Sequence, residues 1–107
     1  MRLKNHVKVD LPIEMPEEQI AAFCQRHHIC KLALFGSVLR DDFGPDSDVD
    51  VLVKFEEGHT PGLAFFRMQD ELSAILGRRV DLNTVGCLSS YFVDEVLAEA
   101  QSFYDAA

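Results

Sequence analysis

Residues 36–50 of this chain read GSVLRDDFGPDSDVD, and this stretch decides how the rest of the sequence is interpreted. It opens with Gly36 and Ser37 and closes on Asp48 and Asp50, two aspartates separated by one residue. Apolar runs flank the stretch on both sides, which places it between two predicted strands. The plainer interpretation is a turn and loop rich in Gly, Pro, Ser and Asp that only joins these strands.

The two ends of the motif suit two parts of one ligand. Gly36 lacks a Cβ, so a ligand can approach its backbone closely. Ser37 adds a hydroxyl and an N–H group, and such turns hold phosphate oxygens. On a strand, Asp48 and Asp50 point to the same face roughly 7 Å apart, and paired carboxylates suit Mg²⁺. The motif therefore predicts phosphoryl or nucleotidyl transfer by a two-metal mechanism.

A third acidic candidate lies in a later predicted strand at residues 79–84. Val80 and Leu82 flank Asp81, so if they face the core, Asp81 faces the side of the Asp48–Asp50 pair. An aspartate on a covered face is costly unless it is paired or metal-bound. Beside the other carboxylates we expect Asp81 to be a metal ligand. The alternative is an exposed sheet face, which needs no explanation.

The arginines near the motif have two interpretations each. Arg40 could bind a triphosphate, because a planar guanidinium holds phosphate oxygens in a fork. It could equally form a salt bridge to Asp41, Asp42 or Asp46. Arg78 and Arg79 stand at a strand start and are expected to be a solvated charge pair, with partner contact as the less favoured interpretation.

These residues give the chain a resemblance to the minimal nucleotidyltransferase (MNT) domains of the DNA polymerase β superfamily. It is most similar to the MntA-type antitoxins that are paired with HEPN toxins. The family pattern is Gly-Ser, ten residues, Asp-x-Asp and a third carboxylate, matched here by Gly36, Ser37, Asp48, Asp50 and Asp81. Arg40 matches an arginine that follows the serine in many members, whereas their next glycine is Asp41 here. The likeness runs from about residue 17 to residue 104.

The resemblance implies a polymerase-β-like nucleotidyltransferase fold and transfer of AMP from ATP to a tyrosine hydroxyl of a HEPN ribonuclease toxin. In this mechanism Asp48 and Asp50 bind two Mg²⁺ ions, and Asp81 joins the catalytic metal and could orient or deprotonate the hydroxyl. Gly36 and Ser37 hold the β- and γ-phosphates. Two alternatives stay open: an antitoxin that neutralises its toxin by binding alone, and transfer to a small molecule. Small-molecule relatives are longer chains with added acceptor domains.

Composition restricts the remaining possibilities. The 107 residues predict a single domain over 1–107, with no room for a second substrate-binding lobe. The net charge of −8 argues against nonspecific nucleic-acid binding, but it is compatible with a metal–nucleotide site and with a basic partner. The chain has 3 cysteines, an odd number, and their spacings match no zinc pattern. Nothing resembles a secretory signal, so we expect reduced thiols and a cytoplasmic protein. No apolar run is long enough to span a membrane.

Periodicity predicts the order helix, strand, strand, helix, strand, helix, which is an α+β domain with a small mixed β-sheet and helices mainly on one face. The first helix opens at Pro16 and the last runs from Ser89 or Ser90 to about Glu99. Strands are expected at 31–35, 48–55 and 79–84, a long helix at 61–76, and a short edge strand at 102–104. The residues expected to be buried on the two later helices include Leu63, Phe66, Leu72, Ile75, Leu76, Val96 and Leu97.

Overall fold

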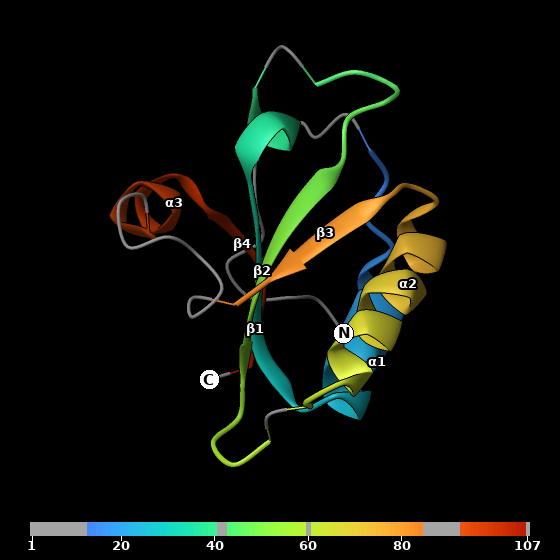
Figure 1. Ribbon diagram of the computed structural model, residues 1–107, viewed down its shortest axis with the longest axis vertical. Helices are drawn as coiled ribbons and strands as arrows, with labels where there is room; N and C mark the ends of the chain where they lie inside the picture. The colour runs from blue at the N-terminus through green and yellow to red at the C-terminus, as the bar shows by residue number, and fades with distance from the viewer. Residues whose placement is uncertain (1–12, 41–42, 60, 85–92, 107) are drawn as a thin grey trace.

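The structure, a computed structural model, describes residues 13–40, 43–59, 61–84 and 93–106. The predicted cap at Ser89 or Ser90, the aspartates at 41 and 42 and the cysteine at 87 lie outside these ranges. In chain order the elements are α1 (Glu17–Arg26), β1 (Ile29–Phe35), the short 3₁₀ helix η1 (Gly36–Leu39), β2 (Val49–Phe55), α2 (Ala64–Leu76), β3 (Val80–Asn83), α3 (Val93–Glu99) and β4 (Gln101–Asp105), as Figure 1 shows. No helix of the described ranges has the length and apolar character that a membrane crossing needs.

The four strands form one mixed sheet in the order β3-β2-β1-β4. β1 pairs antiparallel with both β2 and β4, whereas β2 and β3 run parallel. Parallel neighbours need a crossover connection, and α2 supplies it. The mixed sheet and the edge strand β4 confirm the predicted α+β class.

One face of the sheet carries the main core, beneath α1 and α2, which lie on the same side in Figure 1. Strand alternation turns Val49, Val51 and Val53 of β2 toward these helices. They pack with buried residues of α1 and α2, namely Ile20, Phe23, Cys24, Met68, Leu72 and Leu76. Each fully buried aliphatic or aromatic side chain contributes roughly 1.5–3 kcal/mol, so this layer fixes the register of β2.

The opposite face, which we call the second face, is covered only in part, by α3, within the described ranges. There Phe35 and Leu52 pack with Val96 and with the partly buried Ala100. Helices therefore pack mainly, but not entirely, on one face.

Three of the predicted core positions are wrong. Leu63, Phe66 and Leu97 are 85%, 65% and 51% exposed. Leu63 precedes the first residue of α2 and so lies outside its buried stripe. Phe66 is two positions before the buried Met68, which puts it on the opposite side of the helix, and Phe65 packs against the core instead. At its start, the buried face of α2 is therefore one residue out of phase with the predicted face.

Candidate active site

Three carboxylates meet at the end of the sheet where β2 and β3 begin. Asp50 of β2 is directly opposite Asp81 of β3 in the parallel register. Both lie on the second face, because the valines beside them, Val49 and Val80, belong to the core on the other face. Asp48 immediately precedes β2 and is close enough to influence the charge of Asp50. The structure thus brings together the three aspartates that the sequence singled out.

The position of Asp81 depends on how β3 is held at the edge of the sheet. The N–H of Leu82 donates to Oε1 of Gln69 at 2.9 Å, and the N–H of Val80 donates to Oγ of Ser73 at 3.0 Å. Both acceptors come from α2. The crossover helix therefore occupies the outer hydrogen-bonding groups of β3 and keeps the strand in register with β2.

The grouping of carboxylates perturbs Asp50. Burial, then the negative charges of Asp81 and Asp48, raises the pKa of the Asp50 carboxyl to about 6, against a smaller opposing effect of Arg40. Asp50 is only partly buried, so a cation can reach it. A divalent cation would relieve this repulsion, and a set of carboxylate oxygens is the donor set that Mg²⁺ prefers. The chemistry of the three side chains fits the implied magnesium site.

Gly36 lies against this cluster in a conformation that favours glycine, with φ of +76°. A Cβ at this position would be 2.1 Å from Oδ2 of Asp50. The sequence suggested that the missing Cβ admits a ligand. In the structure the space beside Gly36 is taken by the Asp50 carboxylate, so the glycine is needed for the close approach of the turn to the acidic cluster.

A residue that the motif did not predict, Glu99, binds both ends of the Gly-Ser turn. Its Oε1 accepts the N–H of Gly36 at 2.9 Å, and its two oxygens accept a guanidinium N–H group of Arg40 at 3.0 and 2.9 Å. Of the two interpretations of Arg40, the structure shows a salt bridge, and the partner that it shows is Glu99. No spacing rule links residues this far apart, which is why sequence reasoning missed Glu99.

The loop before Asp48 is held by the arginine pair that was expected to be solvated. The Arg78 guanidinium donates to the carbonyl oxygens of Gly44 at 2.8 Å and Ser47 at 3.3 Å, and it lies 4.7 Å from the centre of the Phe43 ring. The expectation is therefore wrong for Arg78. Arg79 is 75% exposed, but its Nε is 3.2 Å from Oδ1 of Asp48. Arg78 thus holds the loop that leads to Asp48, and Arg79 contacts the Asp48 carboxylate itself.

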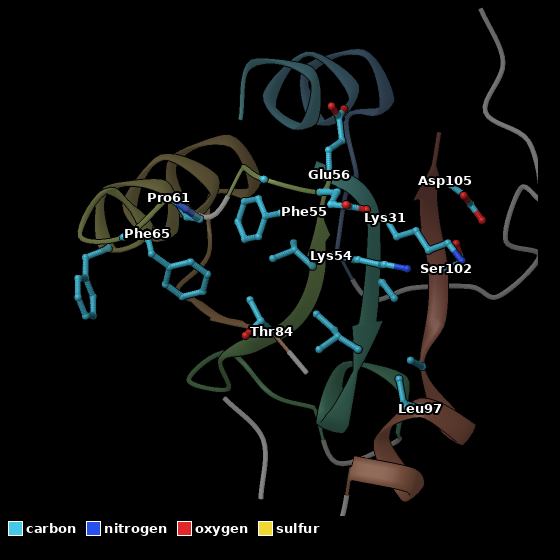
Figure 2. Close-up of a pocket in the computed structure, with 18 residues that line it drawn as sticks. Lys31, Lys54, Phe55, Glu56, Pro61, Phe65, Thr84, Leu97, Ser102 and Asp105 are labelled. Atoms are coloured by element: carbon cyan, nitrogen blue, oxygen red, sulfur yellow. The ribbon is translucent and has the colours of Figure 1, made fainter. Parts of the chain in front are cut away.

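The second face continues from the carboxylates into an apolar groove of about 960 Å³. Leu52, two residues after Asp50 on the same face, is part of its lining. Figure 2 shows Phe55 and Phe65 on one side of the groove and Leu97 of α3 at the end nearest that helix. Phe66 and Leu97, two of the three side chains that the sequence pattern wrongly placed in the core, thus line an open apolar surface beside the acidic cluster.

A second group of potential metal ligands, His28, Glu56 and His59, is exposed. It lies beyond the far end of β2 from Asp50. The two imidazole rings are stacked at 3.9 Å with 15° between their planes. Lone pairs in nearly parallel ring planes do not converge on one point, so this arrangement is not a metal centre as it stands.

Comparison with known proteins shows the family to which the chain belongs. The family model described as nucleotidyltransferase domain matches residues 16–102. The chain belongs to this family. One relative of this chain is the protein adenylyltransferase MntA of Thermococcus cleftensis. It is 41% identical to this chain over 76 residues, which are 70% of this chain and 75% of the relative.

Solved structures give the same fold. A minimal nucleotidyltransferase structure shares 39% identity and superposes with a TM-score of 0.65 over 78% of this chain and 85% of that chain. A toxin–antitoxin complex with AMP-PNP gives 0.69 at 19% identity, covering 85% and 74%. The complex of a tri-AMPylated Shewanella oneidensis HEPN toxin with its MNT antitoxin gives 0.62 at 20% identity, covering 83% and 69%. The protein is a minimal nucleotidyltransferase with the fold expected from its sequence.

Proposed function

We propose that this nucleotidyltransferase transfers AMP from Mg²⁺–ATP to a tyrosine hydroxyl of a HEPN-family toxin and so acts as its antitoxin. The observation that carries the proposal is the row of carboxylates in which Asp50 faces Asp81 beside the Gly36 turn. Relatives support the chemistry and the partner: one is named protein adenylyltransferase MntA, one structural neighbour contains AMP-PNP, and another contains an AMPylated HEPN toxin.

Each side chain has a distinct role in this reaction. Asp48 and Asp50 would hold two Mg²⁺ ions, and Asp81 would contribute to the site of the catalytic ion. When bound, Mg²⁺ neutralises charge on the triphosphate and on the departing pyrophosphate. Asp81 also orients the acceptor hydroxyl and takes its proton as the oxygen bonds to the α-phosphorus and the bond to the pyrophosphate oxygen breaks. Ser37, at the turn, contacts the β- and γ-phosphates.

Nucleotide binding is the first test. The double variant Asp48→Asn/Asp50→Asn keeps the shape of the site but removes two negative charges, so calorimetric titration should show metal-dependent ATP binding reduced to below detection. Asp70→Asn on α2 is the control, because Asp70 is an exposed acid outside the cluster and should leave binding unchanged. Unaltered Mg²⁺–ATP affinity in the double variant would remove the carboxylates from the site.

The transfer step is tested on the partner. Intact-mass spectrometry of a co-expressed HEPN protein should show a gain of about 329 Da per AMP, the formula mass of the transferred group. Asp81→Ala should slow transfer by orders of magnitude while weakening ATP binding less than the double variant does. Transfer at a near wild-type rate in this variant would make Asp81 an ordinary surface residue.

Neutralisation by binding alone is a second candidate, favoured by the open apolar groove beside the carboxylates. The double Asn variant separates the two mechanisms, since it removes turnover but leaves the groove intact. If it still neutralises toxicity in cells, and the partner shows no mass gain with the wild-type protein, the binding mechanism is correct. If protection is lost together with the mass gain, neutralisation depends on catalysis.

A further inference from the structure

Glu99 reaches the Gly-Ser turn because the sheet brings it there. In the antiparallel pair of β1 and β4, Gln101 is opposite Leu34. Two residues further along each chain in the antiparallel direction are Gly36, just past the end of β1, and Glu99, just before β4. The hydrogen bond from the Gly36 N–H to Glu99 Oε1 therefore continues the pairing of β1 with β4 through a side chain.

The same carboxylate closes the turn at its other end. η1 begins at Gly36, and its C-cap residue is Arg40, whose guanidinium donates to both Glu99 oxygens. One side chain from α3 thus fixes the first residue and the last residue of the turn. Hydrogen bonds to an ionised group are the stronger kind, and the Glu99 side chain is partly buried, at 35% exposed.

The turn consequently lies between two acidic side chains, Asp50 and Glu99. On one side Asp50 occupies the space where a Gly36 Cβ would lie, and on the other Glu99 takes the Gly36 N–H group. We infer that Glu99 is a positioning residue for the nucleotide site. It orients the turn so that Ser37 contacts phosphate, and it holds Arg40 beside Asp50. This inference rests on the proposed function of the site.

An alternative is that Glu99 occupies the place of a phosphate and must leave when ATP binds. Leaving would break its three hydrogen bonds to Gly36 and Arg40. All three have an ionised acceptor and are of the stronger, charge-assisted kind, so their loss is unfavourable. The positioning role needs no such loss.

The two roles predict opposite changes in affinity. Under the positioning role, Glu99→Ala should weaken Mg²⁺–ATP binding about tenfold in calorimetric titration of the full chain, because the turn is no longer held. Glu99→Gln should be intermediate, since its amide oxygen still accepts the Gly36 N–H but lacks the charge that Arg40 needs. Glu95→Ala, an exposed acid on the same helix, is the matched control and should bind as the wild type does.

A transfer assay with the partner separates positioning from a general loss of structure. Glu99→Ala should raise KM for ATP about tenfold and change kcat by less than about threefold, because the three aspartates are untouched. Tighter ATP binding in Glu99→Ala would overturn the inference and show that Glu99 competes with phosphate. Affinity equal to that of the wild type in both Glu99 variants would overturn it as well.

A readout without nucleotide keeps this inference distinguishable from the proposed function. In ¹⁵N-labelled protein, exchange of the Gly36 amide hydrogen should be at least about tenfold faster in Glu99→Ala than in the wild type, with partial protection in Glu99→Gln. Absence of ATP binding by the wild type would refute the proposed function alone. An unchanged Gly36 amide would refute the positioning role, whatever the protein binds. If Glu99→Ala fails to fold by circular dichroism, Glu99→Gln decides both measurements.

Discussion

Replacing Gly36 by alanine should destabilise the protein through a collision with its own acidic site. The added Cβ would stand 2.1 Å from Oδ2 and 3.1 Å from Cγ of Asp50, far inside contact distance. The residue also has φ of +76°, a conformation that costs an L-residue about 1–2 kcal/mol. Alanine therefore adds a backbone cost and a steric cost at the same position.

Gly58→Ala separates the two costs. Gly58 has φ of +82°, but a Cβ there would have no atom within 4 Å. Its substitution should lower the free energy of unfolding by about 1 kcal/mol, because the backbone penalty is partly offset by a stiffer unfolded chain. Gly36→Ala adds the overpacking penalty of about 1–3 kcal/mol. We expect a total loss of about 2–4 kcal/mol.

Urea unfolding followed by circular dichroism measures both variants, in buffer with EDTA so that metal does not contribute. The steric part should be relieved when the clashing atoms are removed, so Gly36→Ala should cost less in an Asp50→Ala background than in the wild type. Equal losses for Gly36→Ala and Gly58→Ala would refute the reasoning. So would a Gly36→Ala penalty that is independent of Asp50.

Three further predictions follow from charge and exposure. Burial and neighbouring acids raise the pKa of Asp50 to about 6 in the folded state, so its stabilising contribution is present near pH 4 and is lost as the pH rises to about 6. Asp50→Asn should therefore stabilise the metal-free protein at pH 7, by about 1 kcal/mol once solvent screening is allowed for. An unchanged thermal midpoint would contradict this prediction. Burial raises the pKa of the Cys24 thiol to about 12. Peptide mapping after brief alkylation at pH 8 should therefore find Cys24 unmodified in the native protein and modified in urea. Labelling of Cys24 in the native protein would show that the core opens. Leu97 is 51% exposed and lines the groove. Leu97→Glu should therefore weaken the complex with the toxin at least about tenfold and leave the affinity for Mg²⁺–ATP unchanged. An unchanged affinity for the toxin would place the partner elsewhere.

The sequence was most informative where function depends on residues that are close in the chain or alternate along one strand. Asp48 and Asp50 are two residues apart, so strand geometry alone predicts their common face. Asp81 could be added because its apolar neighbours indicate which way it points, and the register of β2 with β3 confirms that it faces Asp50.

The errors have a physical cause in contacts between distant segments. The hydrogen bonds of Glu99 join residues more than fifty positions apart in the chain, and no local pattern encodes such a pairing. Helical periodicity predicts Phe66 on the buried side of the helix at 61–76, but Phe66 is 65% exposed. Periodicity does not distinguish a buried face from an apolar surface that is exposed for a partner.

The repulsion within the acidic cluster must be balanced by structure that lies outside it, and α2 is where this can be tested. β3 carries Asp81, and its outer N–H groups donate to Gln69 and Ser73 of α2, while its inner side pairs with β2. Gln69 lies on α2, at the outer edge of β3, and Gln69→Leu removes the acceptor of the Leu82 N–H. If these bonds hold Asp81 against Asp50, this substitution should lower the affinity for Mg²⁺–ATP severalfold. Asp70→Asn, one residue along the same helix, controls for a general effect of altering α2. Calorimetric titration that finds equal affinity in Gln69→Leu and the control would show that pairing with β2 alone is sufficient to hold the third carboxylate in place.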